Sequence, residues 1–214
     1  MSKHIIGLIL IFVAASSPPT EAQDFSGAAS VGIEYYDAPS LSQYFSATTG
    51  NQTPGTYTTS VQLEAAVEYF VATDWALGIE YAYLTNQSNG NGLQIGYSYS
   101  LPTITVRRVV TGDNYYLRFG GGIGYHFSSL GQDVLAYGST TNYSSSGLGL
   151  KFDAALDSKL GENLYARVDA DARAEFTGIL KTKDGTPLRI AVTSAEVNSD
   201  FSGVGIALGL VYYF

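Results

Sequence analysis

The last fourteen residues of the chain, 201–214, alternate between apolar and mostly small side chains with a period of two. The apolar positions are Val204, Ile206, Leu208, Leu210, Tyr212 and Phe214. A period of two over this length predicts a β-strand with one apolar face. The segment is longer than the usual strand of about five or six residues in a soluble sheet. We therefore expect its apolar face to contact lipid chains and its small face to line the lumen of a barrel.

Seven further segments show the same alternation. They are expected at about 29–35, 60–71, 77–83, 93–110, 115–127, 148–157 and 164–176. Tight turns are expected at 73–74, 111–114 and 161–163, and the other four connections are longer. The 24 glycines and 17 tyrosines also favour strands and turns over helices. The sequence therefore predicts an all-β fold, an eight-stranded antiparallel transmembrane β-barrel with up-and-down topology.

Segment 93–110 has two possible interpretations because the parity of its apolar residues changes at Pro102. A bulge near Pro102 would keep the segment as one strand, whereas a break would make nine strands. An even number of strands keeps both ends of the barrel on one side of the membrane, so we expect one bulged strand.

The longer connections are expected outside the membrane. Residues 37–56 and 130–146 are rich in polar and turn-forming residues, which predicts polar loops. Residues 179–192 contain Lys183-Asp184-Gly185-Thr186 between β-compatible flanks, which predicts a hairpin. The last two strands could then continue above the membrane as a projecting ribbon, with a disordered loop as the alternative.

Residues 1–22 have the features of an export signal. Lys3 gives a basic start, an apolar run follows to Ala15, and Thr20-Glu21-Ala22 is a small-x-small cleavage site, with an earlier site possible at 13–15. The run is shorter than the roughly 20 residues of a transmembrane helix. We therefore expect a signal peptide at 1–22 and a barrel domain at 23–214, exported to an oxidising compartment without cysteines.

Composition excludes several functions. The formal net charge is −8, which argues against nucleic acid as a partner. Only one histidine, His126, lies outside the predicted signal peptide, so no metal-ligand cluster and no cofactor are expected. Trp75 lies at a predicted turn, where an indole is typical of a membrane interface, so we expect it to be an interface anchor.

Acidic and basic residues share the lumen-facing positions of the predicted strands. The expected interior charge network contains Glu64, Glu68, Glu80, Arg118, Lys151, Asp153, Arg167, Asp169, Asp171 and Arg173. An eight-stranded barrel has an interior that side chains just fill, which favours a hydrogen-bonded plug that fixes strand register. The alternative is a narrow ion path, which the excess of acids would make cation-preferring.

Taken together, residues 23–214 resemble the small outer-membrane barrels of the OmpA-transmembrane, OmpX and opacity-protein type. The resemblance implies a monomeric protein in the outer membrane of a Gram-negative bacterium, in contact with outer-membrane lipid. It also implies that the barrel-insertion machinery recognises Tyr212 and Phe214 as an insertion signal. Expected roles are envelope integrity, or surface adhesion to a host or surface ligand through the loops. A small porin or a conduit for hydrophobic ligands is the alternative.

His126 and Ser128 lie two residues apart on one expected face. A His-x-Ser pair near an acid resembles the hydrolytic site of outer-membrane lipid A deacylases. In that family the pair lies in the penultimate strand, whereas here it lies in the fifth. A lipid hydrolase is therefore the least favoured of the three functions, and we expect no catalytic residues and no enzyme activity.

Overall fold

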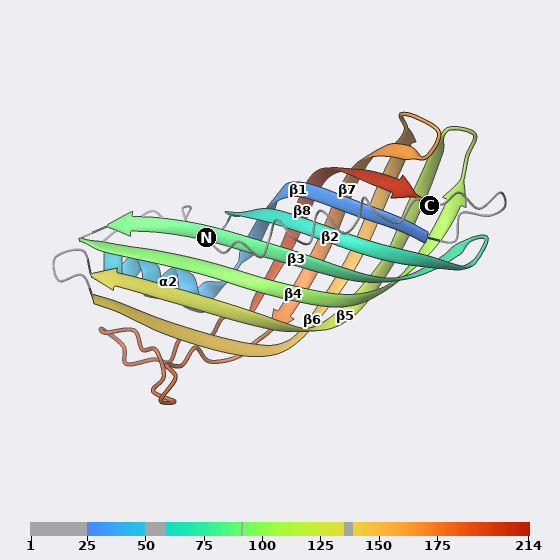
Figure 1. The fold of residues 1–214 in the computed structure, drawn as a ribbon. Helices are drawn as coiled ribbons and strands as arrows, with labels where there is room; N and C mark the ends of the chain where they lie inside the picture. Colours follow the sequence, from blue (N-terminus) through green and yellow to red (C-terminus); the bar gives the residue numbers. More distant parts are fainter. Residues whose placement is uncertain (1–24, 50–58, 91, 135–138) are drawn as a thin grey trace.

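The structure, a computed structural model, describes residues 25–49, 59–90, 92–134 and 139–214. Eight antiparallel strands form a closed barrel in which neighbours in sequence pair and β1 pairs with β8 (Figure 1). The strands are β1 (Phe25–Asp37), β2 (Thr59–Ala72), β3 (Trp75–Gly90), β4 (Leu93–Thr111), β5 (Tyr115–Val134), β6 (Ser139–Lys159), β7 (Leu164–Phe176) and β8 (Phe201–Tyr213). The predicted eight-stranded up-and-down barrel is confirmed. The predicted signal peptide at 1–22 lies outside the described residues.

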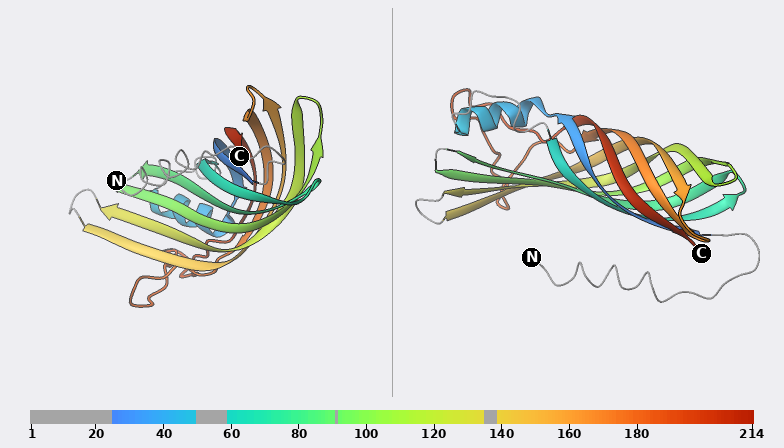
Figure 2. Two further views of the ribbon diagram at one scale, coloured as in Figure 1. Left: turned by 45° about the vertical axis from the view of Figure 1, so that its right-hand side comes forward. Right: turned by 90° about the horizontal axis from the view of Figure 1, so that it is seen from above.

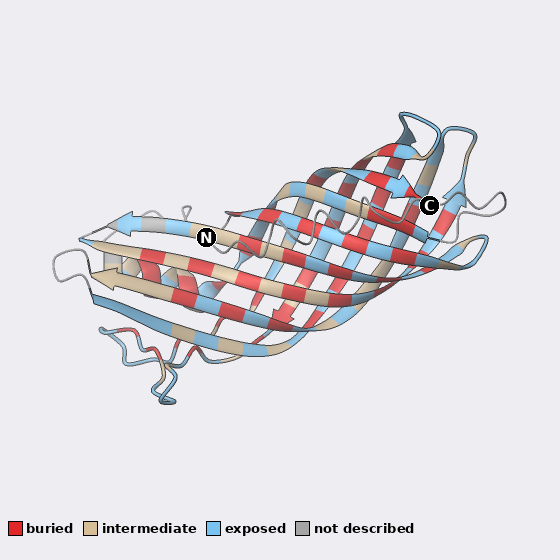
Figure 3. Ribbon diagram, in the orientation of Figure 1, coloured by how far each residue is buried: buried red, intermediate tan, exposed pale blue. Residues whose placement is uncertain are grey.

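The outer surface of the barrel is apolar and its inner surface is polar. Buried and exposed residues alternate along the strands, as the bands in Figure 3 show. Large apolar side chains are exposed on every strand, among them Ile33, Leu63, Ile79, Ile104, Ile123, Phe152, Val168 and Leu208. An exposed apolar surface of this extent is compatible with a lipid environment and not with water. The structure is therefore that of a transmembrane barrel.

The strands have unequal lengths. β3, β4, β5 and β6 extend past the others at the end opposite the tight turns (Figures 1 and 2). The prediction of a polar loop at 130–146 is wrong for most of that range, because β5 and β6 continue to pair there, for example Leu130 with Tyr143. Short turns are typical of the periplasmic end of such barrels, so we take the extended end as extracellular.

A helix replaces part of the loop predicted at 37–56. α2 (Pro39–Thr49) begins with a proline, whose fixed φ suits the first turn of a helix. Its buried residues Leu41, Tyr44 and Phe45 have the spacing of one helical face. The helix forms because this apolar face has a surface to cover. Among the described residues, no helix has the length and apolar character to cross a membrane.

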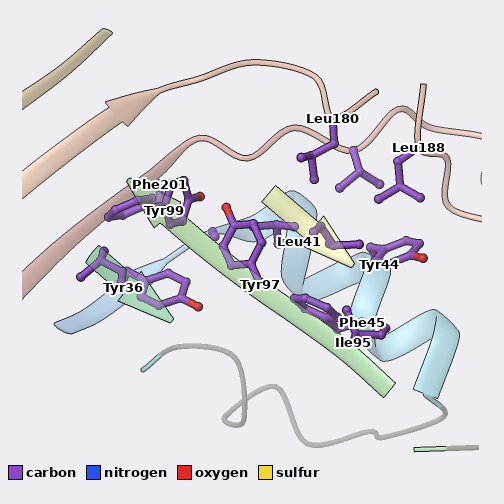
Figure 4. Packing of buried hydrophobic residues seen from close by; sticks show 14 of the residues in the cluster. Tyr36, Leu41, Tyr44, Phe45, Ile95, Tyr97, Tyr99, Leu180, Leu188 and Phe201 are labelled. Carbon is purple, nitrogen blue, oxygen red and sulfur yellow. The ribbon is translucent and has the colours of Figure 1, made fainter. Parts of the chain in front are cut away.

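An apolar cluster joins α2 to the extended strands. It contains residues of three kinds of segment: Tyr36, Leu84, Ile95, Tyr97, Tyr99, Leu101 and Leu130 from strands, Leu41, Tyr44 and Phe45 from α2, and Leu180, Leu188, Ile190, Val197 and Phe201 from the chain around the last long connection. Figure 4 shows α2 and residues 177–200 packed against β4. Burial raises the pKa of Tyr44 to about 12, and its hydroxyl donates to Gln132 Oε1 at 2.9 Å. We call α2 with residues 177–200 the cap.

The predicted bulge near Pro102 is absent. Ser100 pairs with Phe127 and Thr103 pairs with Gly124, so the register of β4 against β5 is the same on both sides of the proline. The expectation of a single strand is confirmed. The apolar residues of β4 change parity at Pro102 because the inner surface of the barrel is apolar under the cap and polar beyond it. Tyr99 is buried under the cap, whereas just beyond Pro102 the inward residues are polar, Thr103, Thr105 and Arg107, and Ile104 and Val106 face outward.

The hairpin predicted at 179–192 is present as a short antiparallel hairpin, in which Leu188 N–H donates to Leu180 O and Thr182 N–H donates to Thr186 O. Gly185 has φ +83°, and its N–H donates to Thr182 O at 2.9 Å. Isolated bridges join Lys181 to Pro187 and Arg189 to Glu196. However, β7 ends at Phe176 and β8 begins at Phe201, so the expected projecting ribbon of the last two strands is wrong. Residues 177–200 instead fold onto the apolar cluster.

Candidate functional site in the barrel lumen

The lumen has three layers between its two ends. At the extracellular end the apolar cluster covers the opening. At the end with the tight turns, Tyr165, Val211 and Tyr213 form a second buried apolar cluster, and Tyr116 stacks on Tyr213 with ring centroids 4.7 Å apart. Between these two layers the inward side chains are charged. The described side chains therefore fill the barrel from one apolar layer to the other.

Arg107 of β4 is the centre of the charged layer. Its Nη1 lies 2.7 Å from Glu68 Oε1, and its Nη2 lies 2.6 Å from Glu80 Oε2. Its guanidinium also pairs with Asp153. The side chain is only 1% exposed. A planar guanidinium has five donors in a fixed arrangement, which lets one arginine hold carboxylates from three other strands.

Lys151 and Arg173 continue the network toward the extracellular side. Lys151 Nζ donates to Glu64 Oε2 at 3.1 Å and to Glu80 Oε1 at 2.5 Å. Arg173 Nη2 lies 3.3 Å from the same Glu64 oxygen, and Arg173 Nε donates to Asp171 Oδ2 at 2.6 Å. Each of these bases therefore bridges two acids, which connects β2, β3, β6 and β7 across the lumen.

A second set of ion pairs lies toward the tight turns. Arg167 Nε donates to Asp157 Oδ1 at 2.7 Å. Arg118 pairs with Glu68 and with Asp157, whose Oδ2 lies 2.8 Å from Arg118 Nε. Tyr213 donates its hydroxyl hydrogen to Asp157 Oδ2 at 2.9 Å. The network therefore ends on the hydroxyl of a tyrosine from the adjacent apolar layer.

Acids outnumber bases in this network. Among the described residues, nine buried carboxylates accompany five buried arginine or lysine side chains: Glu34, Glu64, Glu68, Glu80, Asp153, Asp157, Asp169, Asp171 and Glu175 with Arg107, Arg118, Lys151, Arg167 and Arg173. Asp169 has neither a hydrogen-bond partner nor an ion pair among the described residues. Its neighbours on the adjacent strands are Ala155 and Ala207, which offer no donor.

Replacing Asp169 with asparagine is expected to leave the free energy of unfolding unchanged or to raise it by about 1 kcal/mol. The substitution removes a buried charge that has no direct partner, and removal of such a charge costs nothing in lost ion pairs. Urea unfolding in detergent micelles, followed by the fluorescence of Trp75, measures the difference. A loss of more than about 1 kcal/mol would mean that Asp169 holds a partner essential to the fold.

His126 has different partners from those that a His-x-Ser site requires. Its Nδ1 lies 2.5 Å from Glu175 Oε2, and its Nε2 lies 3.1 Å from Thr103 Oγ1. Ser128 instead bonds Ser145 and Ser199, at 2.6 Å and 2.9 Å. His126 has no exposed surface and lies between the charged layer and the cap. These contacts tie β4, β5 and β7 together and do not join His126 to Ser128.

The structure places all ten residues of the expected charge network in the lumen, and it pairs all of them except Asp169. Sequence reasoning did not assign to the network two polar side chains that bond its members, Gln62 and Tyr213, nor Thr103, which contacts His126. The inward parity of β2 and β8 could have identified Gln62 and Tyr213. The inward direction of Thr103 was not predicted, because a bulge was expected at the adjacent Pro102. In the described part of the chain, no group of three or more His, Cys, Asp or Glu has the arrangement of a metal site.

The remaining predicted residues lie on the outer surface. Trp75 begins β3 at a tight turn and is 40% exposed, with the Arg108 guanidinium 5.8 Å from its ring centroid. Tyr212 and Phe214 form an edge-to-face ring pair with centroids 5.0 Å apart. The roles of Trp75 as an interface anchor and of Tyr212 and Phe214 as an insertion signal stay predictions.

Neither a family model nor a curated protein matches the sequence. Solved structures do match. The attachment invasion locus protein Ail of Yersinia pestis has a TM-score of 0.54 at 13% identity, over 89% of this chain and 99% of that chain. Neisserial surface protein A has a TM-score of 0.56 at 8% identity, over 90% and 98%. A major outer membrane protein from Thermus thermophilus has a TM-score of 0.56 at 14% identity, over 89% and 99%.

At these low sequence identities, the similarity to the three solved structures is a similarity of fold alone. The closed barrel and its apolar outer surface define a small eight-stranded barrel of the outer-membrane type. The expected resemblance to small outer-membrane barrels is thereby confirmed, and the predicted localisation in the outer membrane agrees with these neighbours.

Proposed function

We propose that this protein is a closed barrel of the outer membrane that acts at the cell surface through its cap and extended strands, in adhesion or envelope integrity. The observation that carries the proposal is the filled lumen, in which ion pairs lie between two apolar layers. A barrel filled in this way has no continuous aqueous path. Residues outside the membrane must therefore make the contacts with other molecules.

The cap offers a surface for such contacts. Its exposed charges on residues 177–200 are Lys181, Lys183, Asp184, Arg189 and Glu196. These five charges sum to +1, in contrast to the formal net charge of −8 of the whole chain. Ail of Yersinia pestis, whose fold is similar, has been crystallised in complex with the heparin analogue sucrose octasulfate, which supports the proposal that this chain also binds a ligand. We propose outer-membrane lipid, the barrel-insertion machinery and a surface ligand as the partners of a monomer.

Surface display tests this proposal. Gram-negative cells that display the protein are expected to adhere to extracellular-matrix proteins or epithelial cells more strongly than cells without it. Replacing Lys183 and Asp184 with Gly-Ser should weaken adhesion, because both residues are exposed at the turn of the cap. The lumen variant Asp169→Asn is the matched control and should adhere like the wild type. Display without adhesion, together with uptake of small solutes, would contradict the proposal and favour the porin alternative.

A further inference from the structure

Three oxygen atoms from three strands converge beside the backbone of β8. A Cβ atom at Gly205 would overlap Glu34 Oε2, and it would lie 2.6 Å from Asp171 Oδ1 and 3.0 Å from Gln62 Oε1. A Cβ atom at Gly203 would lie 2.5 Å from Glu34 Oε1. Glycine at these two positions is what allows the carboxylate of Glu34 to approach the strand. We call the three oxygens beside Gly205 the Gly205 oxygen cluster.

The oxygens of this cluster have no hydrogen-bond donor among the described residues. Glu34 and Gln62 are fully buried, and Asp171 is 5% exposed. The orientations of two side chains are fixed by their other atoms. Gln62 Nε2 donates to Glu64 Oε2 at 3.0 Å, which turns its oxygen toward the cluster. Asp171 Oδ2 accepts from Arg173 Nε at 2.6 Å, which leaves Oδ1 facing Glu34.

Among the described residues, Arg173 is the one base that pairs with both carboxylates of the cluster. Arg173 Nε lies 3.8 Å from Glu34 Oε2 and is already bonded to Asp171. Lys151 is bonded to Glu64 and Glu80. Two adjacent buried carboxylates therefore share one guanidinium that also pairs with two further acids, Glu64 and Glu80. Two buried carboxylates that share a single guanidinium are costly unless another positive charge balances them.

We propose that the Gly205 oxygen cluster binds one hard metal cation, Na⁺ or Ca²⁺. Carboxylate and carboxamide oxygens are the ligands that hard cations prefer, and Ca²⁺ binds oxygen at about 2.3–2.6 Å. The donor set contains oxygen alone, so it is unsuited to soft metals that prefer sulfur. A cation held by three protein oxygens keeps water at its other coordination positions. The bound charge would join β1, β2 and β7 beneath the cap.

Thermal unfolding in three salts tests the proposal. The mature protein in detergent micelles is compared in sodium chloride, calcium chloride and choline chloride at matched ionic strength, because choline is too large for the cluster. A ligand that binds only the folded state raises the melting temperature, and saturation of the site should raise it by about 5 °C. Titration calorimetry with the stabilising salt should then give one bound cation per chain.

Substitutions locate the site. Glu34→Gln keeps the shape of the side chain but removes its charge, and it should weaken cation affinity at least about tenfold with loss of the melting shift. Gln62→Leu removes a ligand without changing charge and should also weaken binding. Glu162→Gln, in the exposed turn between β6 and β7, should bind like the wild type.

Equal melting temperatures of the wild type in all three salts would overturn the proposal, since protons shared by the carboxylates would then balance the charge. A shift that both Glu34→Gln and Gln62→Leu retain would also overturn it, because the cation would lie elsewhere. If Glu34→Gln does not fold, the wild-type salts and Gln62→Leu still decide the outcome. A response to calcium alone or to sodium alone supports the proposal and identifies the ion.

Discussion

Replacing Arg107 with methionine is expected to lower the free energy of unfolding by about 3–5 kcal/mol. Methionine keeps much of the length of the side chain but removes the charge that Glu68, Glu80 and Asp153 share. The three carboxylates would keep only Arg118, Lys151 or Arg173 as partners, and nine buried acids would face four buried bases. Uncompensated buried charge is among the largest destabilising changes a substitution can make. Urea unfolding in detergent micelles, with the heat-dependent gel shift as a second measure, gives the loss.

Arg189→Met is the matched control for this prediction. Arg189 also pairs with a carboxylate, at 2.8 Å from Glu196, but the two side chains are 54% and 38% exposed. Pairs in water contribute little, so this substitution should cost about 1 kcal/mol or less. Equal losses for Arg107→Met and Arg189→Met would show that the lumen network does not stabilise the barrel.

Replacing Ile206 with arginine is expected to cost about 2–4 kcal/mol. Ile206 lies near the middle of β8, and its side chain is 59% exposed on the outer surface. A charged side chain there must be inserted among lipid chains, and this cost is largest near the midplane of the bilayer. Unfolding of the protein refolded into lipid bilayers measures the effect.

Val192→Arg provides the comparison for the lipid-facing site. Val192 is more exposed than Ile206, at 84%, but it belongs to the cap. Arginine at this position should change the free energy of unfolding by no more than about 0.5 kcal/mol. Similar costs at positions 192 and 206 would place the membrane elsewhere on the barrel than we describe.

The alternation of side chains was sufficient to predict the barrel. Within the membrane-spanning part, the strands are apolar on one side and mostly polar or small on the other, as in β2. This pattern determines which residues face lipid and which face the lumen. The pattern could also predict that Lys151 and Glu80 share an interior. It could not predict their pairing, because partners come from different strands and depend on how the barrel closes.

The cap could not be predicted in the same way. The spacing of Leu41, Tyr44 and Phe45 is a helix signal, but it is short and lies among turn-forming residues. The helix is stable because the apolar inner surface of the extended strands covers its buried face. The same surface made Pro102 resemble a bulge, since apolar residues of β4 face the cap on one side of it and lipid on the other. Tertiary packing decided both cases.

Conductance of the folded protein in a planar bilayer tests the closed lumen most directly. The filled interior predicts no steady current for the wild type, because ion pairs and two apolar layers occupy the path. Replacing Arg118 and Arg167 with serine removes two long side chains from the charged layer and should permit a measurable current. A steady, cation-preferring current through the wild type would contradict the account and make the protein a small porin.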